Sequence, residues 1–284
     1  STYKYPVFRN KVCTMKTPSV ICYERLSAES ANSKLQVQSG FTLIELMISM
    51  TLGLMLLLVI STVFVSSRQS FREQEDNARI QESGRFALEI IGRSLKQAGH
   101  VEVPFDDFKV AFEGTAISGT NGGAGVADTL TVQHEGAVGD QDCEGTGVNV
   151  AGSIIQNFFN LDAVNAELQC QGVNSPPPAV PAAPAGAPIG NVLLENVEDL
   201  QIVYGIDNDA DQSVDRYVAA PADWNQVLTA RVCVQIRSDK TNIVPAGTSY
   251  LDCNNTPIEN AADRRLRRTF TATFNLRNRI NFLP

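Results

Sequence analysis

The stretch that decides the fold is GFTLIELMISMTLGLMLLLVISTVFV, residues 40–65. From Phe41 to Val65 it holds 25 residues, and Glu45 is the only charged one among them. A helix of this length covers roughly 37 Å, which exceeds the ~30 Å hydrocarbon core of a bilayer. A secretory signal peptide is the alternative, but its apolar region is only about 7 to 15 residues and ends at a small residue, whereas Gly40 precedes this run. We therefore predict a membrane-spanning helix over residues 41–65.

The charges around this helix predict its orientation. Residues 1–40 carry six Lys or Arg against two Glu, a sum of +4. Because the net charge of the chain is −8, the remaining residues sum to −12. Because basic flanks stay in the cytoplasm, we expect the N-terminus there and the body on the opposite side of the membrane. The acidic body also argues against general nucleic-acid binding, which needs a basic face.

The residues around Gly40 form a processing motif. Gly40 is followed by Phe-Thr-Leu-Ile-Glu and then by the apolar run. This pattern resembles the processing site of type IV prepilins and of the related pseudopilins of type II secretion. The resemblance implies that a prepilin peptidase cuts between Gly40 and Phe41 and methylates the new N-terminus of Phe41. Residues 1–40 would be a cytoplasmic leader that is removed. A start at Met15 gives a leader of 26 residues, so we expect residues 1–14 not to be native to it.

Glu45 is the fifth residue of the mature chain under this resemblance. Cleavage leaves a cationic amine on Phe41, and burying that amine among packed apolar helices is costly without a counter-charge. In the family the glutamate is understood to neutralise the amine of the neighbouring subunit, which sets the stagger of the growing filament. An ionisable group inside a membrane span is a functional candidate by default, so we assign Glu45 to assembly. A polar residue merely tolerated near the interface, and a role in presenting the chain to the peptidase, are the alternatives.

The helix is predicted to continue beyond the membrane. Residues 66–99 contain no Pro, their apolar residues recur at helical steps, and Gly99 is a suitable stop. From residue 100 to 284 the pattern changes to short alternating runs broken by Gly, Asn and Asp, which is typical of strands. The expected strands lie within residues 127–135, 191–207, 227–238 and 267–280. An antiparallel sheet packed on the helix buries their apolar faces most simply.

The predicted class is therefore α+β, a pilin-like lollipop with a long N-terminal helix and a β-rich head over residues 100–284. Within the head, SPPPAVPAAPAGAPIG (residues 175–190) contains six Pro. That number excludes a helix interior or a central strand, and we expect an exposed extended loop.

The cysteines fit this topology. Cys13 and Cys22 fall in the leader, which faces a reducing cytoplasm, whereas four others fall in the translocated body, where disulfides persist. Four cysteines allow three pairings. We favour Cys143 with Cys170 and Cys233 with Cys253, because each pair closes a local loop rich in turn residues. A zinc site has little support, since the sequence has no Cys-x-x-Cys.

One acidic run is a candidate metal site. GIDNDADQSVDRY places carboxylates at relative positions 1, 3, 5 and 9, the spacing with which a calcium loop offers its oxygens. These carboxylates are Asp207, Asp209, Asp211 and Asp215. Gln212 stands where an EF-hand has its turn glycine, and Val218 where it has the closing Glu. A Ca²⁺ site completed by backbone carbonyls and a solvated acidic turn are the two interpretations.

Catalytic motifs are absent from the sequence. It has no Gly-x-Ser-x-Gly, no His-Glu-x-x-His and no phosphate-binding Gly-Lys-Ser/Thr, so we predict a protein that is not an enzyme. The cluster RRLRR (residues 264–268) is suited to contacting phosphate or an acidic partner. A basic strand edge that discourages unwanted pairing is the more common explanation.

Features of the head favour one branch of the pilin superfamily. The acidic turn with VDRY, the run DWNQVLTARVCVQIRS and the terminal RRTFTATFNLRNR are similar to the PilW family of minor pilins. With the N-terminal motif, this resemblance covers most of residues 40–284. It implies a scarce subunit that promotes assembly of a type IV pilus for twitching motility, adhesion or DNA uptake.

The same resemblance implies partners and a location. The partners are other minor pilins and the major pilin in an initiating complex at the pilus tip, the prepilin peptidase, the inner-membrane assembly platform and a PilY-type tip adhesin. The location is the bacterial inner membrane, with the head periplasmic, and then the pilus tip at the cell surface. Two alternatives stay open: a minor pseudopilin of the J type in type II secretion, and a membrane-anchored periplasmic binding domain that keeps residues 1–40 and does not need Glu45.

Overall fold

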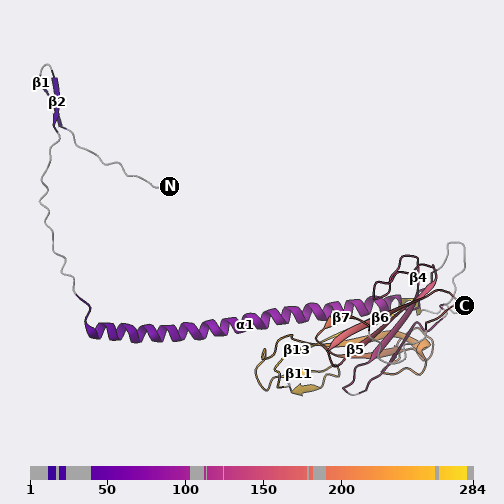
Figure 1. Ribbon diagram of the computed structural model, residues 1–284. Helices are drawn as coiled ribbons and strands as arrows, with labels where there is room; N and C mark the ends of the chain where they lie inside the picture. Colours follow the sequence, from indigo (N-terminus) through magenta and orange to yellow (C-terminus); the bar gives the residue numbers. More distant parts are fainter. Residues whose placement is uncertain are drawn as a thin grey trace. The chain divides into compact units, whose positions relative to one another are not determined.

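The computed structural model describes residues 12–16, 19–23, 40–102, 112, 114–123, 125–177, 179–181, 190–259 and 262–279. The chain divides into two units, Ser1–Val59 and Ile60–Pro284. The first unit contains a hairpin of β1 (Val12–Lys16) and β2 (Ser19–Tyr23) and the start of the helix α1 (Leu43–Gln97), which continues into the second (Figure 1). Most of the predicted leader and of the Pro-rich loop lies outside the described residues.

The helix α1 is 55 residues long. An 18-residue window of it reaches a mean hydropathy of 2.5, so it is long and apolar enough to cross a membrane. It begins at Leu43 rather than at Phe41, and it ends just before Gly99. Gly99 takes the left-handed conformation, with φ of 69°, that terminates many helices and that strains glycine least.

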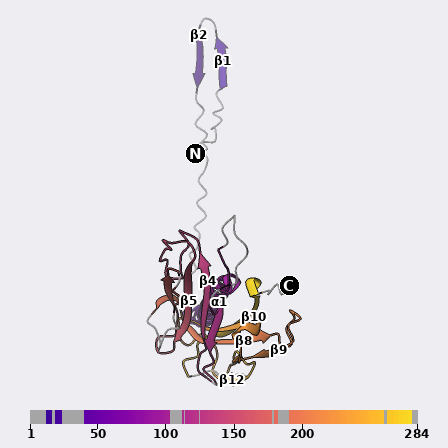
Figure 2. The ribbon, with the colours of Figure 1, turned by 90° about the vertical axis from the view of Figure 1, so that its right-hand side faces the viewer.

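Two antiparallel sheets make up the rest of the second unit. The larger has the order β3-β4-β5-β6-β7 and the smaller the order β13-β10-β8-β9, and their strands run in different directions in Figure 2. The strands of the larger sheet are β3 (Ile117–Thr120), β4 (Thr129–Gly136), β5 (Ser153–Asp162), β6 (Glu167–Ser175) and β7 (Asn191–Glu195). The strands of the smaller sheet are β8 (Val197–Ile206), β9 (Arg216–Val218), β10 (Val227–Arg237) and β13 (Arg267–Asn275).

Shorter elements lie between these strands. β11 (Ser249–Leu251) and β12 (Pro257–Glu259) form a separate hairpin, and η1 (Trp224–Gln226) and η2 (Arg277–Arg279) are single turns of 3₁₀ helix. The α+β class with a long apolar helix and antiparallel sheets is confirmed. The described part of the head contains two large sheets and the short β11–β12 hairpin, where the sequence predicted one sheet.

The core forms where α1 meets both sheets. Ile80, Ala87, Ile91 and Leu95 on one face of the helix are buried, at successive spacings of seven, four and four residues. On β13, Phe270 and Phe274, which lie four residues apart on one face of the strand, pack against this core. A methyl group on Gly84 or Gly92 of α1 would overlap the rings of Phe270 and Phe274, respectively. The two glycines therefore allow the aromatic strand to approach the helix closely.

Gly92→Ala is expected to destabilise the head. The overlap with Phe274 costs about 1–3 kcal/mol, which exceeds the ~1 kcal/mol that alanine gains over glycine in helix propensity. Thermal unfolding of the detergent-solubilised chain, followed by circular dichroism, measures the change. Gly53→Ala is the matched control, because nothing lies within 4 Å of a Cβ at that helical position. Equal melting temperatures for both variants would contradict this packing.

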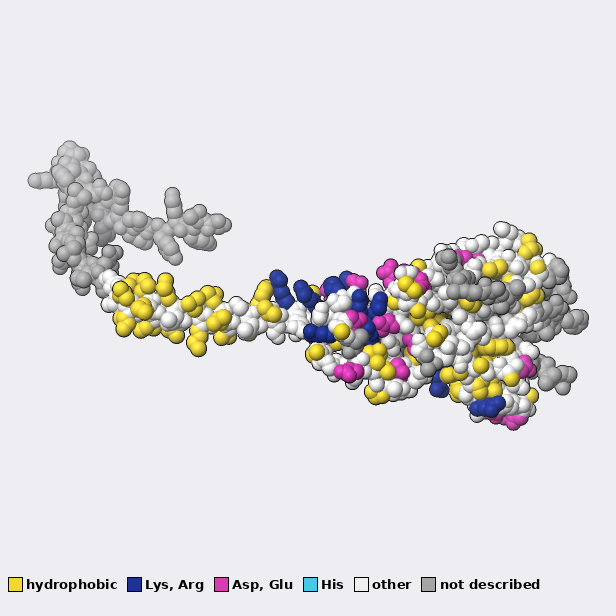
Figure 3. Space-filling model, turned by 60° about the horizontal axis from the view of Figure 1, so that its bottom comes forward, with side chains coloured by type: hydrophobic (Ala, Val, Ile, Leu, Met, Phe, Trp, Pro, Cys, Tyr) yellow, Lys and Arg dark blue, Asp and Glu magenta, His cyan; other side chains and the backbone are white. Residues whose placement is uncertain are grey.

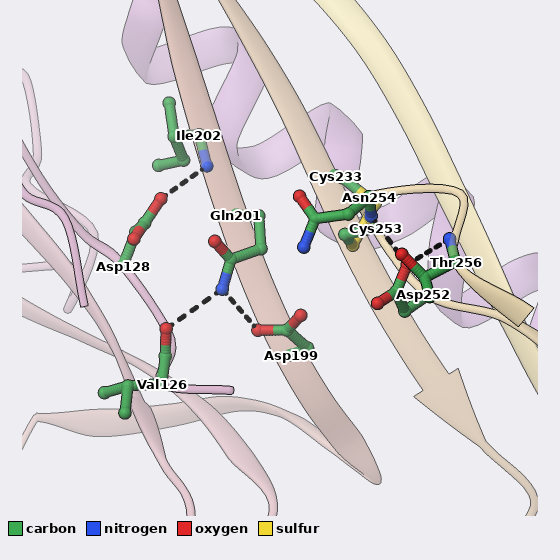
Figure 4. The surroundings of a disulfide bond; sticks show 10 residues. All are labelled: Val126, Asp128, Asp199, Gln201, Ile202, Cys233, Asp252, Cys253, Asn254 and Thr256. Carbon is green, nitrogen blue, oxygen red and sulfur yellow. Dashed lines mark hydrogen bonds between the residues drawn. A yellow bond between two sulfur atoms is a disulfide. The ribbon is translucent and has the colours of Figure 1, made fainter. Parts of the chain in front are cut away.

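One carboxylate joins the two sheets. Asp128, which is buried, lies just before β4 and accepts a hydrogen bond from the backbone N–H of Ile202 in β8, at 2.7 Å (Figure 4). It also accepts one from the backbone N–H of Gly122, at 2.9 Å. Its own N–H donates to the carbonyl of Leu200 at 2.8 Å. Burial raises the pKa of Asp128. Asp128 thus pairs with the backbone of Leu200 and Ile202, in the part of β8 that β9 does not reach, because β9 pairs only with residues 204–206.

Two disulfides fix loops to the sheets. Cys143 is bonded to Cys170 of β6, with the Cα atoms 6.2 Å apart, and Cys233 of β10 to Cys253, with the Cα atoms 5.7 Å apart. These are the two pairings that the sequence favours. Beside the second disulfide, Asp252 accepts from the N–H groups of Asn254 and Thr256 and shapes the turn between β11 and β12 (Figure 4).

Candidate functional site

The processing and assembly residues lie at the start of α1. Gly40, Phe41 and Thr42 precede the helix, and the side chain of Phe41 is 84% exposed. The Thr42 hydroxyl oxygen accepts a hydrogen bond from the N–H of Glu45 at 3.3 Å, and the Thr42 carbonyl accepts from the N–H of Leu46 at 3.2 Å. Thr42 is thus the N-cap of the helix, and Glu45 occupies the third helical position.

Sequence reasoning overlooked the role of Thr42, although its signal was present. Thr-x-x-Glu before an apolar run is the sequence pattern of a capping box, and residues 42–45 read Thr-Leu-Ile-Glu. The cap holds Glu45 in the first turn, where the helix dipole favours a negative charge. The carboxylate is therefore stabilised locally while its side chain stays exposed.

The surface around Glu45 is suited to packing against other helices. Every residue of the apolar run is exposed in this chain except Gly53, which is partly exposed. Figure 3 shows hydrophobic side chains along this part of α1, followed by a gathering of Lys and Arg side chains where the run ends. Ser49 and Thr51 donate their hydroxyl groups to the carbonyls of Leu46 and Ile48, so the helix satisfies them itself. Glu45 is left as the one charged group on this apolar surface.

The acidic run forms the loop between β8 and β9. The structure brings the carboxylates of Asp207, Asp209 and Asp215 within 4.8 Å of one another. Asp211 is outside this group, and its carboxylate accepts from the N–H of Ser213 at 2.8 Å. Three of the four predicted ligands therefore converge.

Hydrogen bonds within the loop already use several of these oxygens. Asp207 accepts from the N–H groups of Ala210 and Gln212, and Asp215 accepts from that of Asn208. The backbone hydrogen bond from Asp211 lowers the pKa of Asp209, but the neighbouring carboxylates outweigh it and leave that pKa raised. The same geometry suits a cation or an acidic turn without one, so the Ca²⁺ site stays a prediction.

The basic cluster RRLRR is engaged within the head. Arg264 donates to the carbonyl of Val244 at 2.9 Å, and Arg265 donates to the carbonyls of Ser238 and Asp239 at 2.6 Å each. Arg267, only 8% exposed, donates to both oxygens of Glu198 and to both of Asp263. Only Arg268 projects as an exposed side chain. A phosphate-binding role for the whole cluster therefore has no support, while β13 does form the edge of its sheet.

Comparisons with known proteins decide the family. The model of the prokaryotic N-terminal methylation motif matches residues 35–61, which include the cap and Glu45. The model of the type IV pilus-assembly protein W, PilW, matches residues 159–278, from the end of β5 to η2. The head matches the PilW family. The motif and the head together support a type IV pilin of this family, with a role in pilus assembly and with a membrane anchor.

Solved structures and curated sequences were also compared with the chain. A type IV-like pilin from Thermus thermophilus aligns with 72% of this PilW-family chain and 98% of its own, at 12% identity and a TM-score of 0.45. No curated protein sequence matches the chain.

Proposed function

We propose that this PilW-family chain is a minor pilin that joins the initiating complex at the tip of a type IV pilus. The observation that carries the proposal is the single carboxylate, Glu45, held by Thr42 in the first turn of an exposed apolar helix. A helix that only anchored a domain would have no use for a charge there. A helix that must pack beside others bearing a cationic N-terminus needs one counter-charge at this level.

The proposed mechanism follows from the same geometry. A prepilin peptidase cuts between Gly40 and Phe41, and the new amine of Phe41 carries a positive charge. On entering the complex, Glu45 faces the amine of an adjacent subunit, while the apolar side chains up to Val65 leave the lipid and pack on neighbouring helices. The pairing is strong because little water remains to screen it. Early subunits of this kind lower the barrier to extracting the first major pilins from the membrane.

The head supports a position at the tip. Residues 100–284 form a large, disulfide-bonded head, and a head of this size is easier to place at the end of a filament than in a closely repeating shaft. We further propose that other minor pilins and a PilY-type adhesin bind there. A J-type pseudopilin shares the helix and processing motif, and deletion separates the two: loss of twitching and surface pili supports the pilus, whereas loss of secreted enzymes with normal pili supports type II secretion.

Mass spectrometry of the N-terminal peptide is the direct test of processing. We expect protein from the membrane and the sheared surface fraction to begin at Phe41 with a methylated amine, and to keep Gly40 in a strain without the prepilin peptidase. An N-terminus upstream of Gly40 in cells that have the peptidase would contradict the proposal and leave an ordinary anchored domain.

A further inference from the structure

A cleft between α1 and β7 contains a buried carboxylate that has no ion-pair partner among the described residues. The cleft, of about 720 Å³, is bounded by helix residues 76–83, by β7 and by residues 236–239 at the end of β10. Asp76 lines it from the helix face that continues into the core, and this residue is 3% exposed. Its Oδ2 atom is buried and has no hydrogen-bond partner among the described residues. An ionised carboxylate in such a place destabilises the free protein.

The other groups of the cleft show which charge is missing. Its two arginines are already paired, Arg79 with Glu75 at 3.0 Å and Arg237 with Glu198 at 3.3 Å. Across the described part of the chain, no ion pair involves the carboxylates of Asp76, Glu195 or Asp239, which all line the cleft. They do not form a cluster close enough to hold one metal ion there. The cleft is therefore complementary to an extended cationic side chain rather than to a bare cation.

The backbone and one further donor favour a peptide as the occupant. β7 is an edge strand, paired only with β6 in the described sheet, and it runs beside α1 (Figure 1). Val192 of β7 is 47% exposed at the mouth of the cleft. The Nε of Arg237 is buried without a partner and can donate to a peptide carbonyl. An extended segment can thus pair with an edge strand while one of its side chains reaches Asp76.

We propose that this cleft is a docking site for a Lys- or Arg-bearing segment of another pilin subunit, whose cation neutralises Asp76. The inference rests on the proposed role of the chain in a complex of minor pilins. The free chain pays for an unpaired buried charge, and that cost is removed only in the complex. Asp76 would therefore select partners that present a basic side chain at this level of the helix.

Photo-crosslinking in cells tests the site with the full-length chain. A photoreactive benzoylphenylalanine at Val192 is expected to crosslink to another pilin subunit, at a segment that contains Lys or Arg. Asp76→Asn is expected to lower that crosslinked fraction at least about tenfold, since removing one member of a buried charge pair strongly weakens an interface. Glu89→Gln is the matched control, because it removes a charge from an exposed position of α1 outside the cleft and should leave the crosslink unchanged.

A stability measurement separates docking from a structural role. Asp76→Asn is expected to melt at or above the temperature of the unmodified chain, because it removes an uncompensated buried charge. A lower melting temperature, an unchanged crosslink in Asp76→Asn, or a crosslink to a segment without Lys or Arg would each overturn the docking site. Pili are counted in the same cells. Normal pili on deletion of the whole chain would refute the pilus function itself, whereas loss of pili on deletion without a Val192 crosslink refutes only the cleft.

Discussion

Glu45→Ala is expected to abolish incorporation into pili while leaving the chain folded and membrane-anchored. In the complex, the alanine leaves the amine of an adjacent subunit buried among apolar helices without a counter-charge. Breaking such a pair costs about 3–5 kcal/mol, which corresponds to a loss of more than about 100-fold in the equilibrium for insertion. The measurement is the amount of the chain in the sheared pilus fraction relative to the membrane fraction, by quantitative immunoblotting.

Two comparisons make this result specific to the charge. Ser49→Ala removes a hydroxyl that the helix already satisfies, from the same apolar run, and should assemble normally. The N-terminal peptide of Glu45→Ala must still begin at Phe41, because an unprocessed variant would show instead that the glutamate serves the peptidase. Wild-type levels of processed Glu45→Ala in pili would contradict the assembly role and favour the anchored binding domain.

Arg267→Met is expected to produce the largest loss of stability in the head. The guanidinium contacts Glu198 at 2.7 and 2.9 Å and Asp263 at 2.8 and 3.0 Å, and only 5% of its side chain is exposed. Methionine fills similar space but removes these four hydrogen bonds. Glu198 keeps longer contacts to Gln235, at 3.1 Å, and to Arg237, at 3.3 Å, and Asp263 keeps contacts to the backbone N–H and the side chain of Arg265, at 3.2 and 3.5 Å. We expect a loss of about 3 kcal/mol in the free energy of unfolding. For a head of this size that is a drop of about 6–12 °C in melting temperature.

The neighbouring arginine supplies the control. Arg268→Met changes the next residue of β13, whose side chain is exposed, and should move the melting temperature little. The hydrogen bond from Arg267 also lowers the pKa of Asp263. The stability that this pair contributes is complete above the ordinary carboxyl pKa of about 4 and is lost as the pH falls further. The difference in free energy of unfolding between Arg267→Met and the unmodified chain should therefore become smaller in acid. Equal melting temperatures for Arg267→Met and the unmodified chain at neutral pH would contradict a stabilising role for the ion pairs of Arg267.

The long helix, its end at Gly99 and several strands of the head were predictable from the sequence because their signals are local. A run of 25 apolar residues has few structural solutions, and Gly99 can end a helix by virtue of its own backbone freedom. The strands β4, β8, β10 and β13 show alternation that is visible in the sequence. β5, with SIIQNFFNLD buried at eight successive positions, has no such alternation, because it lies in the middle of its sheet and is covered on both faces.

Sequence alone determined that the chain has an apolar helix with one carboxylate, a processing motif and a β-rich head, since each depends on neighbouring residues. Only the tertiary structure decided which distant groups meet. It assigned the basic cluster 264–268 to internal pairing by bringing Glu198 to Arg267, and it separated Asp211 from the other three acids of its loop. It also left the buried Asp76 without an ion-pair partner among the described residues, although two arginines line the same cleft. Charge pairing acts through space, so spacing along the chain cannot reveal which charges the fold leaves unpaired.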